Sequence, residues 1–284
     1  MCRWMAWFGQ PVLIEELLFK TQHGIVDQAL HARMGAEPTN GDGFGLGWYG
    51  SGNGPGVYRS VAPAWSDVNL RELAAHIESP LFLAHVRAAI GSPVQETNCH
   101  PFRNGTWLFV HNGYIADFHE LRRDLMLAID PPLFADVHGS TDTEVLFNLA
   151  WTMGLADDPL GALERAVGFV EATARRRGVK PHVQGSFGVT DGITLWAVRY
   201  ATDGPARSLF ASADVDAIKR LHPDNPRFAR LSVDDRVVVS EPFSDLPGVW
   251  EEIEQGTAAS IRRGGEIERR SFRPQAVDAT VAAV

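Results

Sequence analysis

The sequence contains little cysteine, no excess of positive charge and no long hydrophobic run. Only two of its 284 residues are cysteines, Cys2 and Cys99. This excludes the dense disulfide framework of small secreted domains and favours a reducing, cytoplasmic setting. The 35 acidic residues outnumber the 26 basic ones and give a net charge of −9, which argues against nucleic acid or an anionic membrane as main partner. No segment approaches the roughly 20 apolar residues of a membrane helix, and polar residues interrupt the apolar start of the chain, so no signal peptide is expected.

The composition is otherwise that of a globular protein, with 45% hydrophobic and 21% charged residues. Apolar periodicity predicts helices at 12–20, 117–129, 141–154 and 158–178. Short β-rich runs bounded by turn residues predict strands at 43–50, 80–89, 106–115, 182–192, 193–201, 207–213 and 235–243. Because strands and helices occur in groups, we expect an α+β layered sandwich with mainly antiparallel sheets. A single domain is expected over 2–272, followed by a loose tail at 273–284.

Cys2 becomes the first residue if Met1 is removed. It then carries a thiol and a free α-amine, and an amine with a pKa of about 7.7 to 8.0 can act as base for a thiol with a pKa of about 8.5. Such a residue is a nucleophile that needs no separate catalytic histidine. The simpler alternative is an incidental cysteine at a frayed terminus.

Arg87 ends an apolar run in the segment AHVRAAIG. A buried guanidinium needs an anion, because leaving it unpaired costs several kcal/mol, and its forked donors suit a carboxylate. That carboxylate can belong to a ligand or to an acidic side chain of the protein. The glycine-rich segment NGDGFGLGWYG at 40–50 allows the close approach of a ligand or another strand, or forms a hairpin. It matches neither a phosphate loop nor a dinucleotide fingerprint.

Two further segments carry polar residues after an apolar run or at a helix start. In LFVHNGYI, the amide of Asn112 and the backbone N–H of Gly113 can supply two converging donors for an oxyanion, or the pair can form a hairpin turn. In GSTDTE, Asp142 falls in the first turn of a predicted helix, where the dipole favours a carboxylate and simple capping is the alternative. The histidines His100, His111 and His138 lack metal-ligand spacing, so we expect no metal and no other cofactor.

Taken together and in this order, MCRW, NGDGFGLGWY, AHVRAAIG, ETNCHPF, HNGYI and GSTDTE resemble the class II glutamine amidotransferases, which are N-terminal-nucleophile (Ntn) hydrolases. The sequence is most similar to their stand-alone members of the YafJ and Dug types. This resemblance implies a four-layer αββα sandwich. It also implies cleavage of a γ-glutamyl amide, such as glutamine or glutathione, through a thioester on Cys2.

The same resemblance implies roles for individual residues. Arg87 and Asp142 would hold the α-carboxylate and α-ammonium of the glutamyl group. Asn112 and Gly113 would form the oxyanion hole. We also place the adjacent His111 among the substrate-binding candidates.

The chain departs from the family pattern after the arginine. Synthase-linked members often continue with Trp-Ala-Thr-His, whereas this chain has Ala-Ala-Ile-Gly at 88–91. We find no synthase or sugar-isomerase domain to receive ammonia, so a complete amidotransferase would need a separate synthase or peptidase subunit. Whether the chain forms a homo-oligomer is left open. Two alternatives are a γ-glutamyl hydrolase of the ergothioneine type, which shares the opening Met-Cys-Arg, and a non-catalytic γ-glutamyl-binding regulatory subunit that retains Met1.

Overall fold

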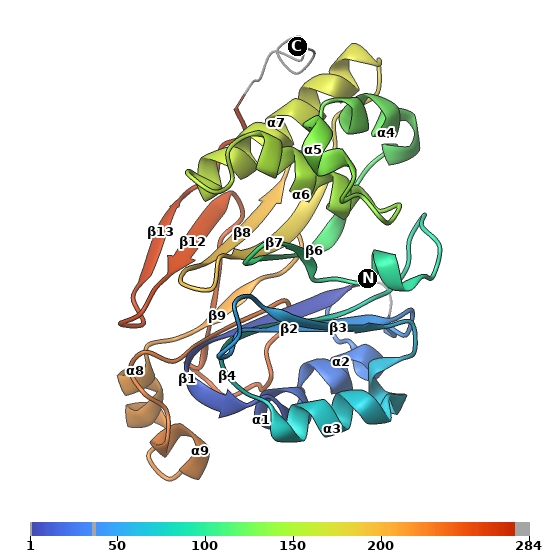
Figure 1. Cartoon of the computed structure of the whole chain (residues 1–284). Helices are drawn as coiled ribbons and strands as arrows, with labels where there is room; N and C mark the ends of the chain where they lie inside the picture. Colours follow the sequence, from blue (N-terminus) through green and yellow to red (C-terminus); the bar gives the residue numbers. More distant parts are fainter. Residues whose placement is uncertain (1, 36–37, 276–284) are drawn as a thin grey trace.

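The structure, a computed structural model, describes residues 2–35 and 38–275. Two β-sheets lie face to face, and helices cover the outer surface of each sheet (Figure 1). The layers therefore follow one another as helix, sheet, sheet, helix. This confirms the four-layer αββα sandwich expected from the sequence.

Both sheets are antiparallel at every pairing. The first has the order β11-β9-β10-β1-β4-β2-β3 and the second the order β13-β12-β8-β7-β6-β5. The strands of the first sheet are β1 (Arg3–Leu13), β2 (Phe44–Trp48), β3 (Gly56–Ser60), β4 (Glu78–Val86), β9 (Phe210–Ser212), β10 (Arg236–Val239) and β11 (Trp250–Glu252). Those of the second are β5 (Phe102–Asn104), β6 (Trp107–Ile115), β7 (Val183–Thr190), β8 (Leu195–Ala201), β12 (Thr257–Ile261) and β13 (Ile267–Ser271).

The helices form two separate layers (Figure 1). The first sheet is covered by α1 (Glu15–Leu18), α2 (Ile25–His31) and α3 (Val68–His76), and the second by α4 (Phe118–Leu127), α5 (Pro131–Phe134), α6 (Asp142–Thr152) and α7 (Pro159–Arg176). Near β9 and β11 lie α8 (Val215–Leu221) and α9 (Pro226–Ala229). Two short 3-10 helices span Ala64–Ser66 and Glu96–Asn98.

Side-chain alternation along the strands divides the hydrophobic core into three layers. On β1, Trp4, Ala6 and Phe8 pack between the two sheets, whereas Met5 and Trp7 pack against the first helical layer. The second sheet has a third core layer on its own helical side. A strand that is buried on both faces needs apolar residues at every position, so its sequence reads as a continuous apolar run.

This continuity explains the one helix prediction that is only partly right. The apolar pattern at 12–20 predicts a helix, but β1 extends to Leu13 and α1 covers only Glu15–Leu18. The predicted helices at 117–129, 141–154 and 158–178 are confirmed as α4, α6 and α7. A short apolar run without clear periodicity fits a buried strand as well as a helix.

Only the first three residues of the expected tail, 273–275, belong to the described part of the chain. The Arg273 N–H donates to Oε1 of Glu164 at 2.7 Å, and the Gln275 N–H donates to the Glu164 carbonyl at 3.1 Å. Residues 273–275 therefore lie against α7, and residues 276–284 of the expected tail lie outside the described part of the chain.

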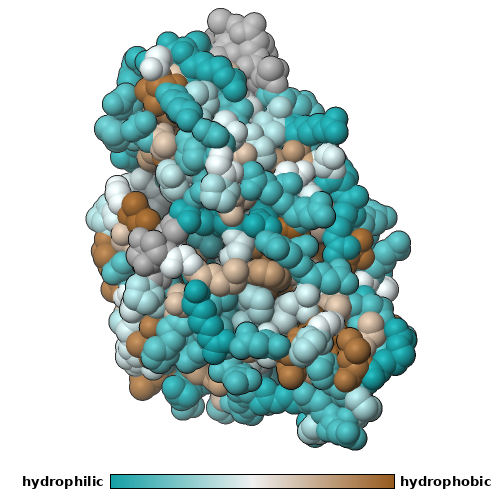
Figure 2. All heavy atoms as spheres, turned by 180° about the vertical axis from the view of Figure 1, so that it is seen from behind, coloured by the Kyte–Doolittle hydropathy of each residue, from teal (hydrophilic) through white to brown (hydrophobic). Residues whose placement is uncertain are grey.

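The face of the molecule drawn in Figure 2 is mainly hydrophilic. Figure 2 shows the face opposite to that of Figure 1, where hydrophobic residues form small separate groups among polar ones. Within the described ranges, no helix is both long and apolar enough to span a bilayer.

The glycines at 43, 45 and 47 lie on one face of the β2 region, since their spacing matches the two-residue period of a strand. A Cβ at Gly45 would collide with the carbonyl oxygen of His100, and one at Gly47 would lie 2.8 Å from Cγ of Pro101. The segment 99–101 thus packs directly on the backbone of β2. Of the two partners considered for the glycine-rich segment, a ligand or another part of the chain, these two glycines therefore contact another part of the chain.

We expect Gly45→Ala to lower the free energy of unfolding by about 3 kcal/mol, because the added methyl group overpacks a backbone contact. Gly50→Ala is the matched control, since a Cβ there meets nothing within 4 Å, and it should stay within about 0.5 kcal/mol of the parent. Urea denaturation of both variants measures the difference. Equal stability of the two variants would contradict the close approach of residues 99–101.

Candidate active site

Strand register in the first sheet brings three sequence motifs together. β1 lies beside β4 with Arg3 opposite Val86, and β2 lies on the other side of β4 with Phe44 also opposite Val86. Since both pairings are antiparallel, the start of β1, the start of β2 and the end of β4 meet at the same edge. Cys2, which precedes β1, therefore lies next to Arg87, which follows β4.

Cys2 is partly buried at this edge. Its Sγ is 3.5 Å from the carbonyl oxygen of Ala88, to which the thiol donates a weak hydrogen bond. Burial raises the pKa of the thiol above its ordinary value, although the Ala88 contact and the charge of Arg87 oppose this shift. The thiol is therefore protonated at neutral pH and needs a base to become a nucleophile.

Arg87 is 3% exposed, yet its partners are neutral oxygen atoms. Nη2 donates to Oγ of Ser92 at 2.7 Å and to the carbonyl of Pro93 at 3.2 Å, and Nη1 donates to the carbonyl of Asp42 at 3.4 Å. In residues 2–35 and 38–275, no acidic side chain forms an ion pair with it. The described residues therefore do not form the internal salt bridge that was the alternative explanation for Arg87.

The carboxylate of Asp42 instead fixes the backbone that follows Arg87. Its Oδ2 accepts a hydrogen bond from the Ala89 N–H at 2.8 Å. The backbone of residues 42 and 43 also exchanges hydrogen bonds with that of Arg87, at 2.9 and 2.8 Å. The glycine-rich segment thus holds the arginine segment in place.

Asn112 and Gly113 lie inside β6, opposite Ser186 and Gly185 of β7. The hairpin-turn alternative for this pair is wrong, since the strand continues to Ile115. Asn112 is 2% exposed, and its buried Oδ1 has no hydrogen-bond partner among the described residues. Its side-chain amide is thus not used to hold the fold.

A tryptophan that sequence reasoning did not select connects the two sheets. Nε1 of Trp4 donates to Oγ and to the carbonyl oxygen of Ser186, at 3.0 and 3.2 Å. Trp4 lies two residues after Cys2, and Ser186 is the register partner of Asn112. A buried indole N–H needs a hydrogen-bond acceptor, and this need was the one sign in the sequence that Trp4 makes a specific contact. The sequence does not show where that acceptor lies.

Asp142 joins the start of α6 to the end of β6. Its Oδ2 accepts a hydrogen bond from the Ile115 N–H at 2.7 Å, and its Oδ1 accepts one from the Thr143 N–H at 2.8 Å. The helix cap is provided by Thr141, whose Oγ1 accepts from the Glu144 N–H at 3.2 Å. Asp142 is therefore not the capping residue of α6.

His111 points to the opposite side of β6 from Asn112. Nδ1 lies 2.9 Å from Oγ1 of Thr143, and Nε2 lies 3.3 Å from the carbonyl oxygen of Gln184. Because a carbonyl only accepts, the Gln184 contact puts the hydrogen on Nε2 and leaves Nδ1 as an acceptor for the Thr143 hydroxyl, which also lies 3.3 Å from Oδ1 of Asp142. Burial lowers the pKa of His111, so the ring is neutral and both its nitrogen atoms contact protein groups.

A hydrogen-bonded path links Arg87 to the Asp142 region without direct contact between their side chains. The Pro93 carbonyl accepts from both Arg87 Nη2 and Asn98 Nδ2, at 3.2 and 3.0 Å. Oδ1 of Asn98 accepts from the Ser140 N–H at 2.8 Å, two residues before Asp142. Asn98 of the ETNCHPF motif therefore connects the two segments.

A buried ion pair holds the start of β1. Nε of Arg3 lies 3.0 Å from Oε2 of Glu241, and both side chains are at most 3% exposed. Nη1 of Arg3 also donates to the carbonyl oxygen of Cys2 at 3.0 Å. Glu241 accepts further hydrogen bonds from Nε2 of His23 at 2.6 Å and from the N–H groups of residues 33–34 at 2.8 and 3.0 Å.

Two neutral histidines lie near Arg87. The rings of His85 and His100 have centroids 4.0 Å apart, and burial together with the charge of Arg87 lowers the pKa of His85 to about 3. They add no positive charge beside the guanidinium. In the part of the chain that is described, no group of three or more His, Cys, Asp or Glu residues is placed to hold a metal ion.

The fold agrees with the family that the sequence matches. Residues 20–204 match the class II glutamine amidotransferases, and the chain belongs to this family. Its architecture is the Ntn-hydrolase fold expected from the sequence. The predicted family and enzyme class are confirmed.

Two curated relatives are similar over nearly the whole chain. The probable glutamine amidotransferase DUG3 of Saccharomyces cerevisiae is 31% identical over 294 residues, covering 93% of this chain and 82% of the relative. The gamma-glutamyl-hercynylcysteine sulfoxide hydrolase of Mycolicibacterium smegmatis is 27% identical over 265 residues, covering 92% of this chain and 96% of the relative.

Solved structures share the fold. A glutamine aminotransferase class-II domain protein from Silicibacter pomeroyi has a TM-score of 0.72 and 35% identity, covering 96% of this chain and all of that one. Glutamine phosphoribosylpyrophosphate amidotransferase from Bacillus subtilis has a TM-score of 0.63 at 16% identity, covering 96% of this chain and 50% of that one. The second likeness concerns the fold alone.

We expect Glu241→Ala to lower the free energy of unfolding by about 3 to 5 kcal/mol, because it removes one partner of a buried ion pair and the acceptor of three further donors. Urea denaturation measures this loss. Glu251→Ala is the control, since Glu251 pairs with Arg269 at the surface and should contribute less than about 1 kcal/mol. Equal losses in the two variants would contradict the assigned role.

The contribution of Glu241 should also depend on pH. Burial acts to raise the pKa of this carboxyl, but hydrogen bonds from His23, residues 33–34 and Arg3 outweigh burial, so the net shift is downward. A lowered folded-state pKa stabilises the protein above the unfolded value of about 4.3, and this stabilisation is lost as the pH falls through the folded-state pKa. The stability gap between parent and Glu241→Ala should therefore narrow in acid.

Proposed function

We propose that the protein hydrolyses a γ-glutamyl amide, with Cys2 as the nucleophile after removal of Met1. The observation that carries this proposal is the buried guanidinium of Arg87, which lies beside Cys2 and has no carboxylate partner among the described residues. The α-carboxylate of a glutamyl group would supply the missing anion in a geometry that suits the guanidinium fork. Both curated relatives carry names for amidotransferase or γ-glutamyl hydrolase activity, which supports this substrate class.

In the proposed reaction, the α-amine of Cys2 removes the thiol proton, directly or through a water molecule. The thiolate then attacks the γ-carbonyl carbon, and the oxyanion accepts hydrogen bonds from the Asn112 amide and the Gly113 N–H. When the C–N bond breaks, the leaving amine takes the proton from the α-ammonium and a thioester remains on Cys2. The α-amine next activates a water molecule, which attacks the thioester and releases the glutamyl group as glutamate.

Asp142 is proposed to bind the α-ammonium of the glutamyl group. Its oxygen atoms already accept backbone hydrogen bonds, but a carboxylate has about four acceptor positions. His111 is proposed to act indirectly. Both of its nitrogen atoms contact protein groups, and its contact with Thr143 steadies the residue next to Asp142.

The ergothioneine-type hydrolase remains the second candidate function, supported by the relative from Mycolicibacterium smegmatis. Both candidates place the recognised charges on the glutamyl part, so the group beyond the γ-amide is less specified. Delivery of ammonia or a peptide product to a separate synthase or peptidase subunit is a further part of the proposal. A cytoplasmic location is also proposed, because Cys2 and Cys99 are free thiols.

We expect Cys2→Ala to abolish both hydrolysis and covalent labelling by an electrophilic γ-glutamyl analogue. Cys99→Ala is the matched control and should keep both activities. Cys99 is fully buried, and burial raises the pKa of its thiol to about 11, so little reactive thiolate forms. Peptide mapping by mass spectrometry identifies the labelled residue. Labelling of Cys99 in place of Cys2 would defeat the proposed mechanism.

Intact mass of the native protein provides the second part of this experiment. The proposal expects a chain that begins at Cys2, because only then is the α-amine available as base. Retention of Met1 together with absence of turnover would favour the non-catalytic γ-glutamyl-binding subunit.

We expect Arg87→Ala to raise KM for a chromogenic γ-glutamyl anilide about 100-fold, which corresponds to about 2.7 kcal/mol of lost binding, because the α-carboxylate loses its charged partner. Arg263→Ala, at an exposed turn, is the control and should leave KM unchanged. Steady-state kinetics with the γ-glutamyl anilide and an α-glutamyl anilide test the assignment. Cleavage of both substrates, or an unchanged KM in Arg87→Ala, would exclude the proposed recognition.

A further inference from the structure

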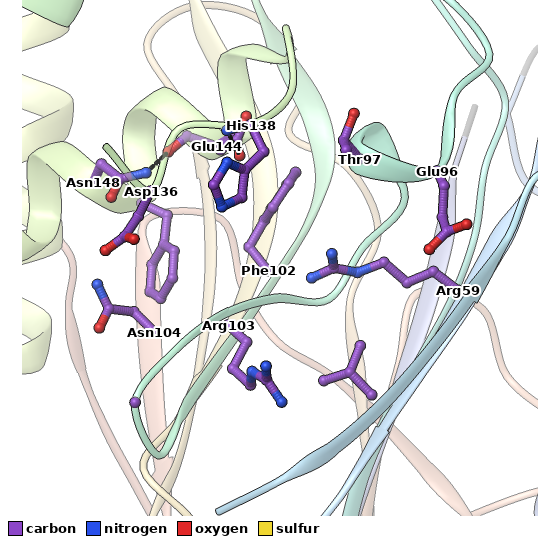
Figure 3. A pocket seen from close by; sticks show the side chains of 13 residues that line it. Arg59, Glu96, Thr97, Phe102, Arg103, Asn104, Asp136, His138, Glu144 and Asn148 are labelled. Atoms are coloured by element: carbon purple, nitrogen blue, oxygen red, sulfur yellow. Dashed lines mark hydrogen bonds between the residues drawn. The ribbon is translucent and has the colours of Figure 1, made fainter. Parts of the chain in front are cut away.

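A cavity of about 440 Å³ lies apart from the proposed glutamyl site. It is formed by β3, β5, the segment at 96–97 and the region from residue 136 to α6 (Figure 3). Cys2, Arg87, Asn112 and Asp142 do not line it. Its volume is within the range of small-molecule sites.

Charges of both signs face this cavity without forming ion pairs. Arg59 and Arg103 extend their guanidinium groups into it, and Asp136 lies on the opposite wall (Figure 3). Arg59 donates to the carbonyl of Pro101 and Arg103 to that of Pro55, and within the described ranges neither contacts a carboxylate. Asp136 likewise has no ion-pair partner in the described part of the chain.

Two uncharged features of the cavity wall also bear on what the cavity can bind. Nδ2 of Asn104 is buried and has no hydrogen-bond partner among the residues described. The rings of Phe102 and Phe147 line the space between the charged groups. The carboxylates of Glu96 and Glu144 also line the cavity, and among the described residues neither forms an ion pair with an arginine of its wall. The cavity therefore offers guanidinium groups for an anion, carboxylates for a cation and an apolar surface between them. A small zwitterion matches all three.

The cavity also shares its walls with segments that hold the glutamyl site. Thr97 lines the cavity, and its neighbour Asn98 donates to the same Pro93 carbonyl that accepts from Arg87. Glu144 lines the cavity two residues after Asp142. A ligand that orders these walls would also order the groups around Arg87.

We propose that this cavity is a second binding site, for a small zwitterion of the amino-acid or dipeptide class, and that its occupancy strengthens glutamyl binding. The carboxylate of the ligand lies at Arg59 and Arg103, and its ammonium lies at Asp136. The amine released from a γ-glutamyl peptide belongs to this chemical class. The coupling to glutamyl binding rests on the proposed function, whereas the binding of the zwitterion does not.

Calorimetric titration of the Cys2→Ala protein with glycylglycine tests binding without turnover. Glycinamide, which lacks the anion, and acetate, which lacks the cation, are the control ligands and should bind at least tenfold more weakly. Arg103→Gln and Asp136→Asn should each weaken glycylglycine binding about tenfold, as expected for loss of one charged contact. Arg263→Gln and Glu266→Gln, both exposed and remote from the cavity, are the matched controls and should bind like the parent.

The glutamyl site itself could accept a zwitterion, so Arg87→Ala is included as a separate arm. Glycylglycine binding that persists in Arg87→Ala and falls in Arg103→Gln assigns the ligand to the cavity. Binding lost in Arg87→Ala but retained in Arg103→Gln and Asp136→Asn would overturn the proposal, as would no measurable binding.

The coupling is measured by the rate at which a subsaturating γ-glutamyl analogue labels Cys2 in the otherwise unchanged protein. Saturating glycylglycine should raise this rate about fivefold, at the lower end of typical coupling between sites, and Arg103→Gln should remove the effect. An unchanged rate would overturn the coupling. Failure of the analogue to label Cys2 under any condition would instead reject the proposed function, and the titration would still decide on the cavity.

Discussion

The register of β1 on β4 is the constraint on which the rest of the site depends. With Arg3 opposite Val86, the start of one strand lies against the end of the other, and Cys2 meets the arginine segment. A shift of one residue would exchange the two faces of β1, moving Trp4 out of the core between the sheets and Met5 into it. Burial on both faces makes such a shift costly, and the Arg3–Glu241 ion pair fixes the same end of the strand.

Two buried arginines near Cys2 show how burial and charge separate a structural from a functional role. Arg3 lies against the carboxylate of Glu241, and this pair joins β1 to the segment after β10. Arg87 is equally buried, yet its hydrogen-bond acceptors are neutral oxygen atoms. Because desolvation of a guanidinium is costly without an anion, the second arrangement is suited to a ligand that brings its own carboxylate.

The two sheets contribute different parts of the proposed chemistry, and they meet through a shared hydrophobic core and a few specific contacts. Trp4 reaches from β1 to Ser186, the partner of Asn112, while the glycines of β2 let residues 99–101 pack closely between the layers. Asn98, which immediately precedes this segment, connects the arginine loop with the start of α6. Glu96 and Thr97, the two residues before Asn98, line the cavity of the proposed second site. The segment 96–98 therefore borders both proposed sites.

The sequence by itself determined the family, the layered α+β class and the positions of α4, α6 and α7, because caps and helical periodicity are local properties of neighbouring residues. It also indicated Cys2, Arg87, Asn112, Gly113 and Asp142 as candidates through motifs whose order is visible in one dimension. Only the tertiary structure decided that 3–13 is a strand, that Asn112 and Gly113 lie within β6, that His111 faces the helices, and that Trp4, Asn98 and Glu241 support the site. These features depend on strand register and on partners up to 238 residues apart, and no local pattern of residues specifies which distant group will accept a given hydrogen bond.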